Sequence, residues 1–438
     1  MLILSIVVTA LVVLYFFGVH VASVLGIIAL GLMVFFSDRP MVEMTGLIAW
    51  NVGTTNVLVA VPMFILMGEL LLRGGLTERL YRCFTAWFHW LPGGLMQANI
   101  ATCAVFAAMS GSTAATAATI SRVAIPAFRA RGYYEPLVVG SLAAGGTLGI
   151  LIPPSIILIV YGVLAEESIG ALYMAGVVPG LLLTALFMAA IAAMALMRPS
   201  IAPREPAVSW GEKLRLSATI LPVGALVFLV LGTIYMGIAT PTEAASLGVV
   251  GAFVLAAIAG KVDPPMLRET LLNTVNTTAM VILIVSAAFM LNFVLAIFGV
   301  PQAMATMVTN LGWSPNAILW VLIVFYLVMG TFMDEYSMLV TTVPVVLPIV
   351  KAIGVDLVWF GILITVLVEV ALISPPHGLN LFVLHNVRMQ SAVKGEKQGT
   401  MIDLFLGVLP FMAVMLVLIG LLVAYPALAT WLPAMMRR

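Results

Sequence analysis

Apolar runs long enough to cross a lipid bilayer recur along this whole chain. A helix needs about 20 apolar residues to cross the hydrocarbon, and the first half offers five such runs, at residues 2–17, 20–36, 53–72, 133–166 and 170–197. Of the 438 residues, 63% are apolar and 8% are charged, whereas about a quarter of a soluble domain is charged. A folded chain in water could not bury so much apolar surface. The sequence therefore predicts an all-α polytopic membrane protein whose solvent is the lipid bilayer.

Several other classes of protein are excluded by what the sequence lacks. The net charge of +1 provides no concentrated basic face, so we expect no nucleic-acid partner. Cys83 and Cys103 are too few for a disulfide framework or a thiolate metal site, and we expect inert thiols. No nucleotide loop, catalytic pair or metal cluster is present, so we expect neither an enzyme nor a cofactor. No basic residue precedes the run at 2–17, which argues for a retained span over a cleaved signal.

The chain contains an internal duplication, visible in its prolines and glycines. An offset of 222 residues joins Pro126 to Pro348, Pro153 to Pro375, Pro154 to Pro376, Gly132 to Gly354, and Gly26 to Gly248. A polar, proline-containing stretch at 198–215 lies between the two copies. We therefore expect a first repeat at 1–197, a cytoplasmic linker at 198–215 and a second repeat at 216–438.

Each copy contains two interrupted elements. Residues 93–128 form an apolar pair too short to cross twice, which predicts a re-entrant helical hairpin, and about 314–350 is its counterpart. The runs at 133–166 and 356–387 each contain a Pro-Pro pair that a continuous helix does not accommodate. Amphipathic stretches at 77–90 and about 301–311 precede the hairpins and predict interfacial helices that brace a moving domain.

The orientation of the two copies follows from counting spans. Five full spans per copy is an odd number, so the second copy is expected to lie upside down, as in secondary transporters with inverted repeats. With residue 1 outside, 14 of the 19 Lys and Arg residues fall inside and four fall outside. This distribution agrees with the positive-inside rule. Arg122 is the one basic residue left within the hydrophobic part.

The hairpin tips and helix breaks carry the polar chemistry. Residues 110–113 read Ser-Gly-Ser-Thr, and hydroxyl and carbonyl oxygens suit an alkali cation. The alternative is small-residue helix packing with hydroxyls bonded to their own helix. A broken helix also leaves free carbonyls on one side and free N–H groups on the other. Asp334 stands 222 residues after Ser112 on the second tip. Together these features predict two cation sites with a substrate site between them.

Ionisable residues inside the bilayer are costly, at roughly 2.5–3.5 kcal/mol each, and mark function or pairing. The six candidates are Glu69, Arg122, Glu243, Asp334, Glu335 and Glu369. Asp334 is the first choice because it lies on the second tip, and Glu369 precedes the second break. Arg122 fits either a substrate anion or an acidic partner equally well. We expect structural roles for Glu69 and Glu243.

Longer motifs resemble one known family. Residues 237–245 read GIATPTEAA and are similar to a signature of the large membrane subunit of tripartite ATP-independent periplasmic (TRAP) transporters. PMFILMGELL at 62–71, SGSTAAT at 110–116, LGILIPPSIILIVYG at 148–162 and MDEYSMLVTTVPVVLPI at 333–349 resemble the same family. The resemblance implies sodium-coupled uptake of an organic acid, such as a C4-dicarboxylate or sialic acid, by an elevator-type fold of the ion-transporter superfamily.

The resemblance also implies partners and a location. We expect a periplasmic substrate-binding (P) protein that delivers the solute, and a small membrane (Q) subunit as a separate chain, because no extra spans flank the two repeats. The location implied is the inner (cytoplasmic) membrane of a bacterium or archaeon. The open alternative is a stand-alone sodium/carboxylate symporter or antiporter of similar fold. A channel is disfavoured because dead-end hairpins do not form a continuous polar pore.

Site residues follow from matching the tips and breaks to the family. The sodium ligands expected are Ser110, Gly111, Ser112, Thr113, Gly146, Thr147, Gly149, Ile150, Thr331, Phe332, Asp334, Ser374 and Pro375. The substrate contacts expected are Ser155, Arg122, Glu335, His377 and Asn380. For His377, a packing role in the interior is an equally good interpretation. Sodium is the one metal expected.

Overall fold

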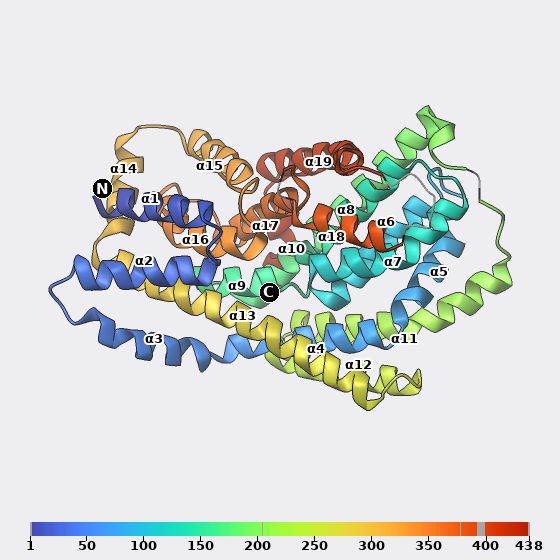
Figure 1. Cartoon of the computed structure of the whole chain (residues 1–438), viewed down its shortest axis with the longest axis horizontal. Coiled ribbons are helices and arrows are strands. Elements are labelled where there is room, and N and C mark those ends of the chain that lie inside the picture. The colour runs from blue at the N-terminus through green and yellow to red at the C-terminus, as the bar shows by residue number, and fades with distance from the viewer. Residues whose placement is uncertain (1, 204, 377, 392–398, 437–438) are drawn as a thin grey trace.

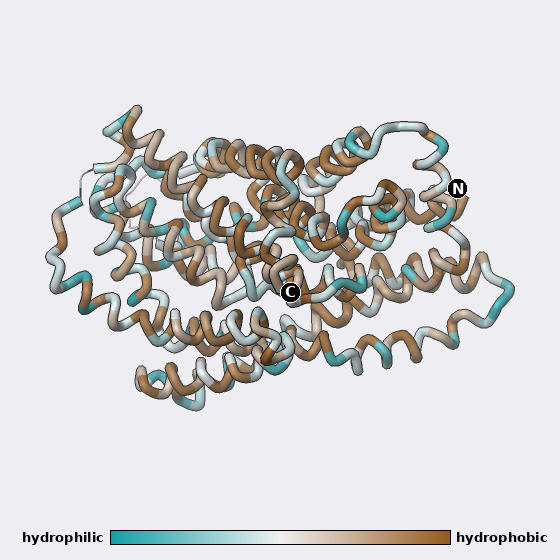
Figure 2. The backbone as a smooth tube through the Cα atoms, turned by 180° about the vertical axis from the view of Figure 1, so that it is seen from behind, coloured by the Kyte–Doolittle hydropathy of each residue, from teal (hydrophilic) through white to brown (hydrophobic). Residues whose placement is uncertain are grey.

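The computed structural model of the chain describes residues 2–203, 205–376, 378–391 and 399–436, and these residues form helices joined by short turns, with no strand among them. Seven of the described helices are long and apolar enough to cross a membrane, and one bent pair of helices gives an eighth by length and composition. The predicted all-α polytopic membrane architecture is confirmed. The polar stretches lie mostly at turns and at the ends of helices (Figure 2).

In the first half of the chain, the described residues form ten α-helices and two 3-10 helices. They are α1 (Leu2–Phe16), α2 (Val21–Phe35), η1 (Met41–Glu43), α3 (Met44–Gly53), η2 (Asn56–Val59), α4 (Ala60–Arg73), α5 (Leu76–Phe88), α6 (Leu95–Ser110), α7 (Thr113–Ala130), α8 (Glu135–Leu151), α9 (Ile156–Ala165) and α10 (Ile169–Met197).

The second half of the chain begins, in its described residues, with the 3-10 helix η3 (Pro199–Ile201). It contains α11 (Trp210–Tyr235), α12 (Pro241–Ile258), α13 (Pro264–Ile297), α14 (Val300–Asn310), α15 (Pro315–Met329), α16 (Glu335–Ala352), α17 (Leu357–Ile373), α18 (Leu379–Gln390), α19 (Met401–Ala424) and α20 (Ala427–Met436).

One boundary differs from the expected organisation. Helix α11 begins at Trp210, inside the stretch 198–215 that we expected to be linker. The reason is local, because the Ser209 side chain accepts a hydrogen bond from the Glu212 backbone N–H at 3.3 Å. A side-chain cap of this kind satisfies one of the free N–H groups at a helix start. Charged residues in the first turn therefore belong to the helix.

The interrupted elements form where the sequence places them. Helices α6 and α7 pack together as the first hairpin, and α15 and α16 occupy the second. Helices α8 and α9 meet at a bend of 42° at the first Pro-Pro pair, and α17 and α18 are separated at the second. The predicted amphipathic stretches are the short helices α5 and α14 that precede the hairpins.

The helices are arranged in two layers (Figure 1). Helices α2, α3, α4, α11, α12 and α13 run along one side of the molecule, where α12 packs on α4 and α13 packs on α2 and α4. The hairpins, the broken helices and α19 lie on the other side. One layer thus contains the hairpins and broken helices together with the span α19, and the other contains the spans α4, α11, α12 and α13.

Candidate functional site: the hairpin tips and helix breaks

The first tip is held by hydrogen bonds among its own hydroxyls. Gly111 adopts the left-handed φ of +57° that glycine tolerates, and it turns the chain between α6 and α7. Ser112 then caps α7 by accepting from the Ala115 N–H at 3.5 Å. Ser110 Oγ lies 2.8 Å from Thr116 Oγ1, and Thr116 Oγ1 donates to the Ser112 carbonyl at 2.7 Å. Hydroxyl and carbonyl oxygens therefore crowd together at the tip.

The first helix break lies directly against this tip. A Cβ atom on Gly149 would lie 3.2 Å from the Ser112 carbonyl oxygen, and one on Gly111 would lie 3.1 Å from the Pro154 carbonyl oxygen. Only glycine permits so close an approach of two backbones. The structure thus brings together the tip residues and the break residues that we predicted as sodium ligands in the first copy.

Other predicted residues of the first break serve the local structure. Thr147 Oγ1 donates to the Ala144 carbonyl at 2.8 Å. Ser155 Oγ donates to the Ile150 carbonyl at 2.5 Å and accepts from the Leu158 N–H at 3.3 Å. Ser155 is fully buried, so its hydroxyl acts as the cap of α9 in this conformation and does not face an open space.

The second tip is built on a carboxylate cap. Asp334 Oδ1 accepts from the Ser337 N–H at 2.9 Å, so Asp334 holds the same capping position on α16 that Ser112 holds on α7. Thr331 Oγ1 donates to the Val328 carbonyl at 2.7 Å. Phe332 is 70% exposed, and its backbone N–H donates to the Met329 carbonyl at 3.0 Å.

Contact between the second tip and the second break again depends on a small residue. A Cβ atom on Gly330 would lie 2.6 Å from the Ala371 Cβ atom, so this glycine lets α15 reach α17. In the break itself, Ser374 Oγ donates to the Val370 carbonyl at 2.8 Å. Pro375 follows directly in the turn between α17 and α18.

The two tips touch through a pair of counterpart residues. Thr113 Oγ1 donates to Glu335 Oε2 at 3.1 Å, and the two residues are 222 positions apart. Both side chains are buried, Thr113 completely and Glu335 with 7% exposure. A contact between two residues that are related by the offset of 222 agrees with the predicted duplication. Sequence reasoning assigned the two residues to different sites, although the offset of 222 was sufficient to pair them.

The packing of the helices repeats this crossed relation. Helix α7 packs on α18, and its counterpart α16 packs on α9, the counterpart of α18. Helix α8 packs on its own counterpart α17. In the other layer, α2 packs on α13, while α12 packs on α4. Each copy therefore completes the packing of the other, and the tips meet where the copies interlock.

Among the described residues, two buried side chains near the second break find no hydrogen-bond partner. Glu369 on α17 and Asn380 on α18 are both fully buried. Neither carboxylate oxygen of Glu369 and neither polar atom of the Asn380 amide makes a hydrogen bond. A buried polar group without a partner costs about 1–3 kcal/mol. Such groups are retained mostly where a ligand or an ion completes them.

The remaining candidates lie away from the tips. Arg122 is exposed on α7, about 14 Å along the helix axis from Thr113 at 1.5 Å per residue. Among the described residues it has no ion-pair partner, so the acidic partner considered for it is not found. His377 lies outside the described residues.

Two other ionisable residues have structural roles, as expected. Glu69 pairs with Arg73 one turn away at 3.1 Å. Glu243 forms a capping box with Thr240 at the start of α12, where Glu243 Oε2 accepts from the Thr240 N–H at 2.8 Å. The GIATPTEAA motif therefore contains the start signal of α12.

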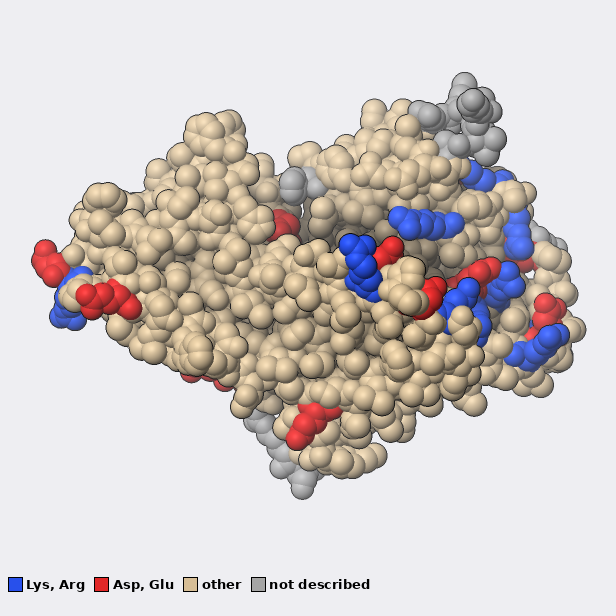
Figure 3. All heavy atoms as spheres, turned by 60° about the horizontal axis from the view of Figure 1, so that its bottom comes forward, with Lys and Arg blue, Asp and Glu red and all other residues tan. Residues whose placement is uncertain are grey.

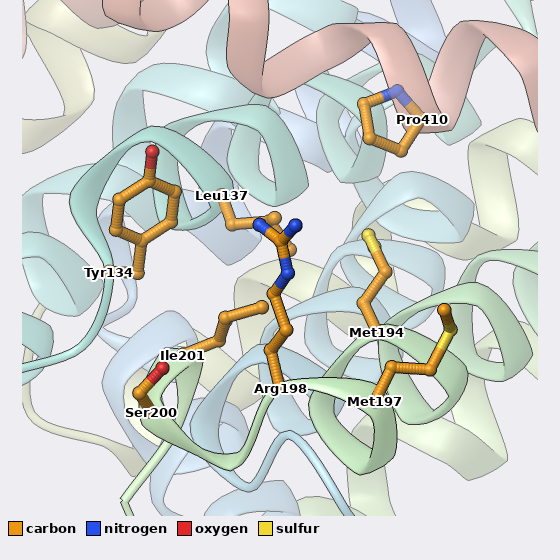
Figure 4. A pocket seen from close by; sticks show the side chains of 8 residues that line it. All are labelled: Tyr134, Leu137, Met194, Met197, Arg198, Ser200, Ile201 and Pro410. Atoms are coloured by element: carbon orange, nitrogen blue, oxygen red, sulfur yellow. The ribbon is translucent and has the colours of Figure 1, made fainter.

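The described residues contain no group of three His, Cys, Asp or Glu side chains that is arranged for a metal ion. One cavity, of about 480 Å³, lies between the start of α8, the end of α10 and Pro410 of α19, and the Arg198 side chain projects into it (Figure 4). None of the predicted site residues lines it. Lys and Arg side chains gather at one end of the molecule around a hollow in the surface (Figure 3).

Comparison with known proteins identifies relatives along the whole chain. The family profile described as "Tripartite ATP-independent periplasmic transporter, DctM component" matches residues 8–428. The C4-dicarboxylate TRAP transporter large permease DctM of Vibrio cholerae is 33% identical, over 96% of this chain and 95% of the relative. The protein of the same name from Pseudomonas aeruginosa is 37% identical, over 86% of each chain.

A solved structure supports the fold independently. The YdaH transporter of Alcanivorax borkumensis superimposes with a TM-score of 0.63 over 90% of each chain, at 14% sequence identity. At that identity the likeness concerns the fold alone. The relatives are transport proteins and not enzymes. By its profile match and its relatives, the chain belongs to the DctM family, the large membrane permease subunits of tripartite ATP-independent periplasmic transporters.

Proposed function

We propose that this chain carries an organic acid into the cell together with sodium ions, and that a periplasmic binding protein delivers the acid. Relatives named for C4-dicarboxylate, sialic acid and isethionate support an organic acid as the class of substrate. Relatives named for ectoine widen that class to zwitterionic carboxylates. The location proposed is the inner membrane of a bacterium or archaeon, with the basic end of the molecule inside.

The observation that carries this proposal is the meeting of the two hairpin tips through Thr113 and Glu335. Each tip also lies against the helix break of its own copy, at Gly149 and at Ala371. Hydroxyl, carboxylate and carbonyl oxygens are hard ligands that suit sodium. Two such clusters in contact give two ion sites on either side of one substrate site. This arrangement supports coupling, because an ion at either tip changes the walls of the site between them.

The layered packing supports an elevator mechanism. Hairpins and broken helices form one layer, and the spans α2, α4, α12 and α13 pack on one another in the other. Helix α5 joins the layers, because it packs on α6 of the first hairpin and on α11. We propose that the polar layer moves as a unit along a fixed frame, with α5 and α14 as the arms, and that the two repeats have inverted topology.

The partners proposed are a soluble substrate-binding protein and a small membrane subunit. One relative, the isethionate permease protein DctMQ of Oleidesulfovibrio alaskensis, is matched over 94% of this chain but over 63% of its own length. Its name combines the letters of the large and small subunits. We propose that the small subunit of this system is a separate chain.

Sodium coupling supplies enough free energy for accumulation. Each sodium ion entering down about 100 mV gains about 2.3 kcal/mol, and a tenfold gradient adds about 1.4 kcal/mol. Two sodium ions with one monoanion then supply roughly 5 kcal/mol. That corresponds to nearly four decades of accumulation.

Uptake by proteoliposomes tests the proposal. The permease, its small subunit and the binding protein are reconstituted with labelled organic acids, and external sodium is replaced by potassium at constant pH and voltage. We expect uptake only with sodium and with the binding protein. Uptake that persists without sodium would contradict the coupling. Sodium-driven uptake without the binding protein would instead indicate a stand-alone symporter.

A further inference from the structure

A second cavity lies between α5 and α11, away from the tips and breaks. Its volume is about 680 Å³, and its walls include Trp87, Trp90, Trp210, Lys213, Ser217 and Ile220. Helix α11 is one of the candidate membrane spans, and it begins at Trp210. The cavity therefore lies where a span enters the bilayer, and Trp90 and Trp210 are each 69% exposed at its mouth. Tryptophan is enriched at that depth of a membrane.

Lys213 is the charged group of this cavity. Its side chain is 8% exposed, which is unusual for lysine. The ammonium Nζ lies 4.8 Å from the ring centroid of Trp210 and 5.8 Å from that of Trp87. Within the described residues, no Asp or Glu carboxylate pairs with it. The aromatic faces stabilise the cation in part, and no hydrogen bond joins its N–H groups to an acceptor among the described residues.

The neighbouring polar groups are occupied and leave Lys213 free to bind. Trp87 Nε1 donates to Ser217 Oγ at 2.8 Å, and Ser217 Oγ donates to the Lys213 backbone carbonyl at 2.9 Å. These bonds fix the walls around the ammonium group. Lys213 also lies in the first turn of α11, where the helix dipole favours an anion.

The cavity is polar at one end and apolar at the other. Ile220 lies seven residues beyond Lys213, about 10 Å deeper along α11. On the α5 side, Phe84 adds a further aromatic side chain to the walls, one helical turn before Trp87. A ligand that fits this cavity has an anionic head at the membrane surface and an apolar portion that runs toward the bilayer interior.

We propose that this cavity is a binding site for an anionic phospholipid, with the phosphate on Lys213 and an acyl chain along Ile220. A free phosphate ion would leave the apolar end unfilled, and it would have to leave water for an aromatic surface. A phospholipid in the leaflet already has its phosphate at the depth of Lys213 and its acyl chains at the depth of Ile220, so it can fill both ends of the cavity. Because α5 also packs on α6 of the first hairpin, a lipid here braces the arm that joins the two layers.

Native mass spectrometry of the purified permease, delipidated together with any membrane subunit that it retains, tests the site. The probes are phosphatidylglycerol, phosphatidylcholine and glycerol 3-phosphate. We expect phosphatidylglycerol to bind in preference to the other two. The Lys213→Met variant is expected to weaken that binding about tenfold or more, because a charge-assisted contact to phosphate is lost. Lys213→Arg keeps the charge and is expected to retain binding.

Lys261→Gln is the matched control, because Lys261 is an exposed lysine just after the end of α12. Thermal unfolding of each variant without lipid separates a folding defect from a binding defect. Equal binding of phosphatidylglycerol and phosphatidylcholine, or an equal loss in Lys261→Gln, would overturn the proposal. Binding of glycerol 3-phosphate as tight as that of the lipid would reduce the site to a simple anion site. Cross-linking of a cysteine at Trp90 to a protein subunit, with no lipid retained, would identify a protein as the occupant.

Discussion

The two copies of the hairpin and broken helix differ in how completely they satisfy their polar groups. At the first tip and break, each buried hydroxyl has a partner: Ser110 with Thr116, Thr147 with Ala144, and Ser155 with Ile150. At the second, two fully buried side chains, Glu369 and Asn380, have none within the part of the chain that the structure describes. The helix caps at the two tips also differ in chemistry. Ser112, a neutral residue, caps α7, whereas Asp334, an acidic residue, caps α16.

The two segments that the offset of 222 relates therefore share hairpins and helix breaks but differ in the chemistry of their buried polar groups. At the first tip and break, the buried hydroxyls are satisfied by neighbouring protein groups, so this site needs no ion to satisfy them. The second copy retains acidic and amide groups at a cost in stability, and such groups in a membrane interior are functional by default. We therefore expect the second copy to depend more on a bound ion or substrate than the first.

The largest expected difference between the copies is the side of the membrane that each counterpart residue faces, and cysteine labelling tests it. Arg39 and Lys261 are counterparts at the 222 offset, and both are exposed. Single cysteines at these two positions, in a background without Cys83 and Cys103, are expected to react from opposite sides of the membrane. An impermeant maleimide applied to intact spheroplasts should label the Arg39→Cys variant fully and Lys261→Cys only after lysis. Labelling of both from one side would remove the basis for comparing the copies as inverted repeats.

The next effect concerns Glu369 and its counterpart Thr147. Because Glu369 has no partner, Glu369→Leu is expected to leave stability unchanged or to raise it by about 1–3 kcal/mol. Sodium-driven uptake should nevertheless fall by about tenfold or more, a loss of about 1.4 kcal/mol or more. Thr147→Val removes a satisfied hydroxyl and is expected to cost about 0.5–1.5 kcal/mol of stability with little change in uptake.

Uptake per folded molecule and thermal unfolding in the same detergent measure the two quantities separately. Glu369→Leu, in the second copy, is expected to lose uptake without losing stability. Thr147→Val, in the first copy, is expected to lose stability with little loss of uptake. A Glu369→Leu protein that unfolds readily but transports normally per folded molecule would assign Glu369 a structural role.

A third effect concerns the close contact at the second tip. A Cβ at Gly330 would meet the Ala371 Cβ at 2.6 Å, so Gly330→Ala is expected to cost about 1–3 kcal/mol through overpacking. In the first copy, Gly149 is the counterpart of Ala371, so the small residue lies in the broken helix. The double variant Gly330→Ala with Ala371→Gly copies that arrangement and should recover about half of the lost stability or more. Additive losses in a thermal double-mutant cycle would show that the two positions do not compete for space.

Much of the fold was predictable from the sequence because its signals are local. The Pro-Pro pairs and the glycine at each tip interrupt helices by backbone geometry, so the breaks and hairpins lie where the sequence placed them. The start of α11 was missed because the capping Ser209 lies inside a charged stretch. The offset of 222 predicted two similar copies, but not how tightly they interlock.

The chemistry of the site was less predictable because partners come from distant segments. Arg388 was counted only as one of the basic residues on the inner side of the membrane, but its side chain is 2% exposed and pairs with Glu135 at 2.7 Å. The vacant hydrogen bonds of Glu369 and Asn380 are properties of packing and have no sequence signature. Small and hydroxyl residues at the first tip are compatible with either close helix packing or a cation site, and the sequence does not distinguish the two. In the structure the tip is closely packed and its hydroxyl and carbonyl oxygens also lie close together.

The smallest effect concerns the one contact that the two tips share. If Thr113 donates to an ionised Glu335, the pair contributes about 1.5–3 kcal/mol, and if the carboxyl is neutral, about 0.5–1.5 kcal/mol. A double-mutant cycle with Thr113→Val and Glu335→Gln measures this coupling by thermal unfolding. In an elevator the two tips move together, so the coupling energy should be the same with and without sodium and substrate. A coupling that disappears when sodium is added would mean that the tips separate during transport. The hairpins would then act as independent gates, and the two copies could not be compared as halves of one moving unit.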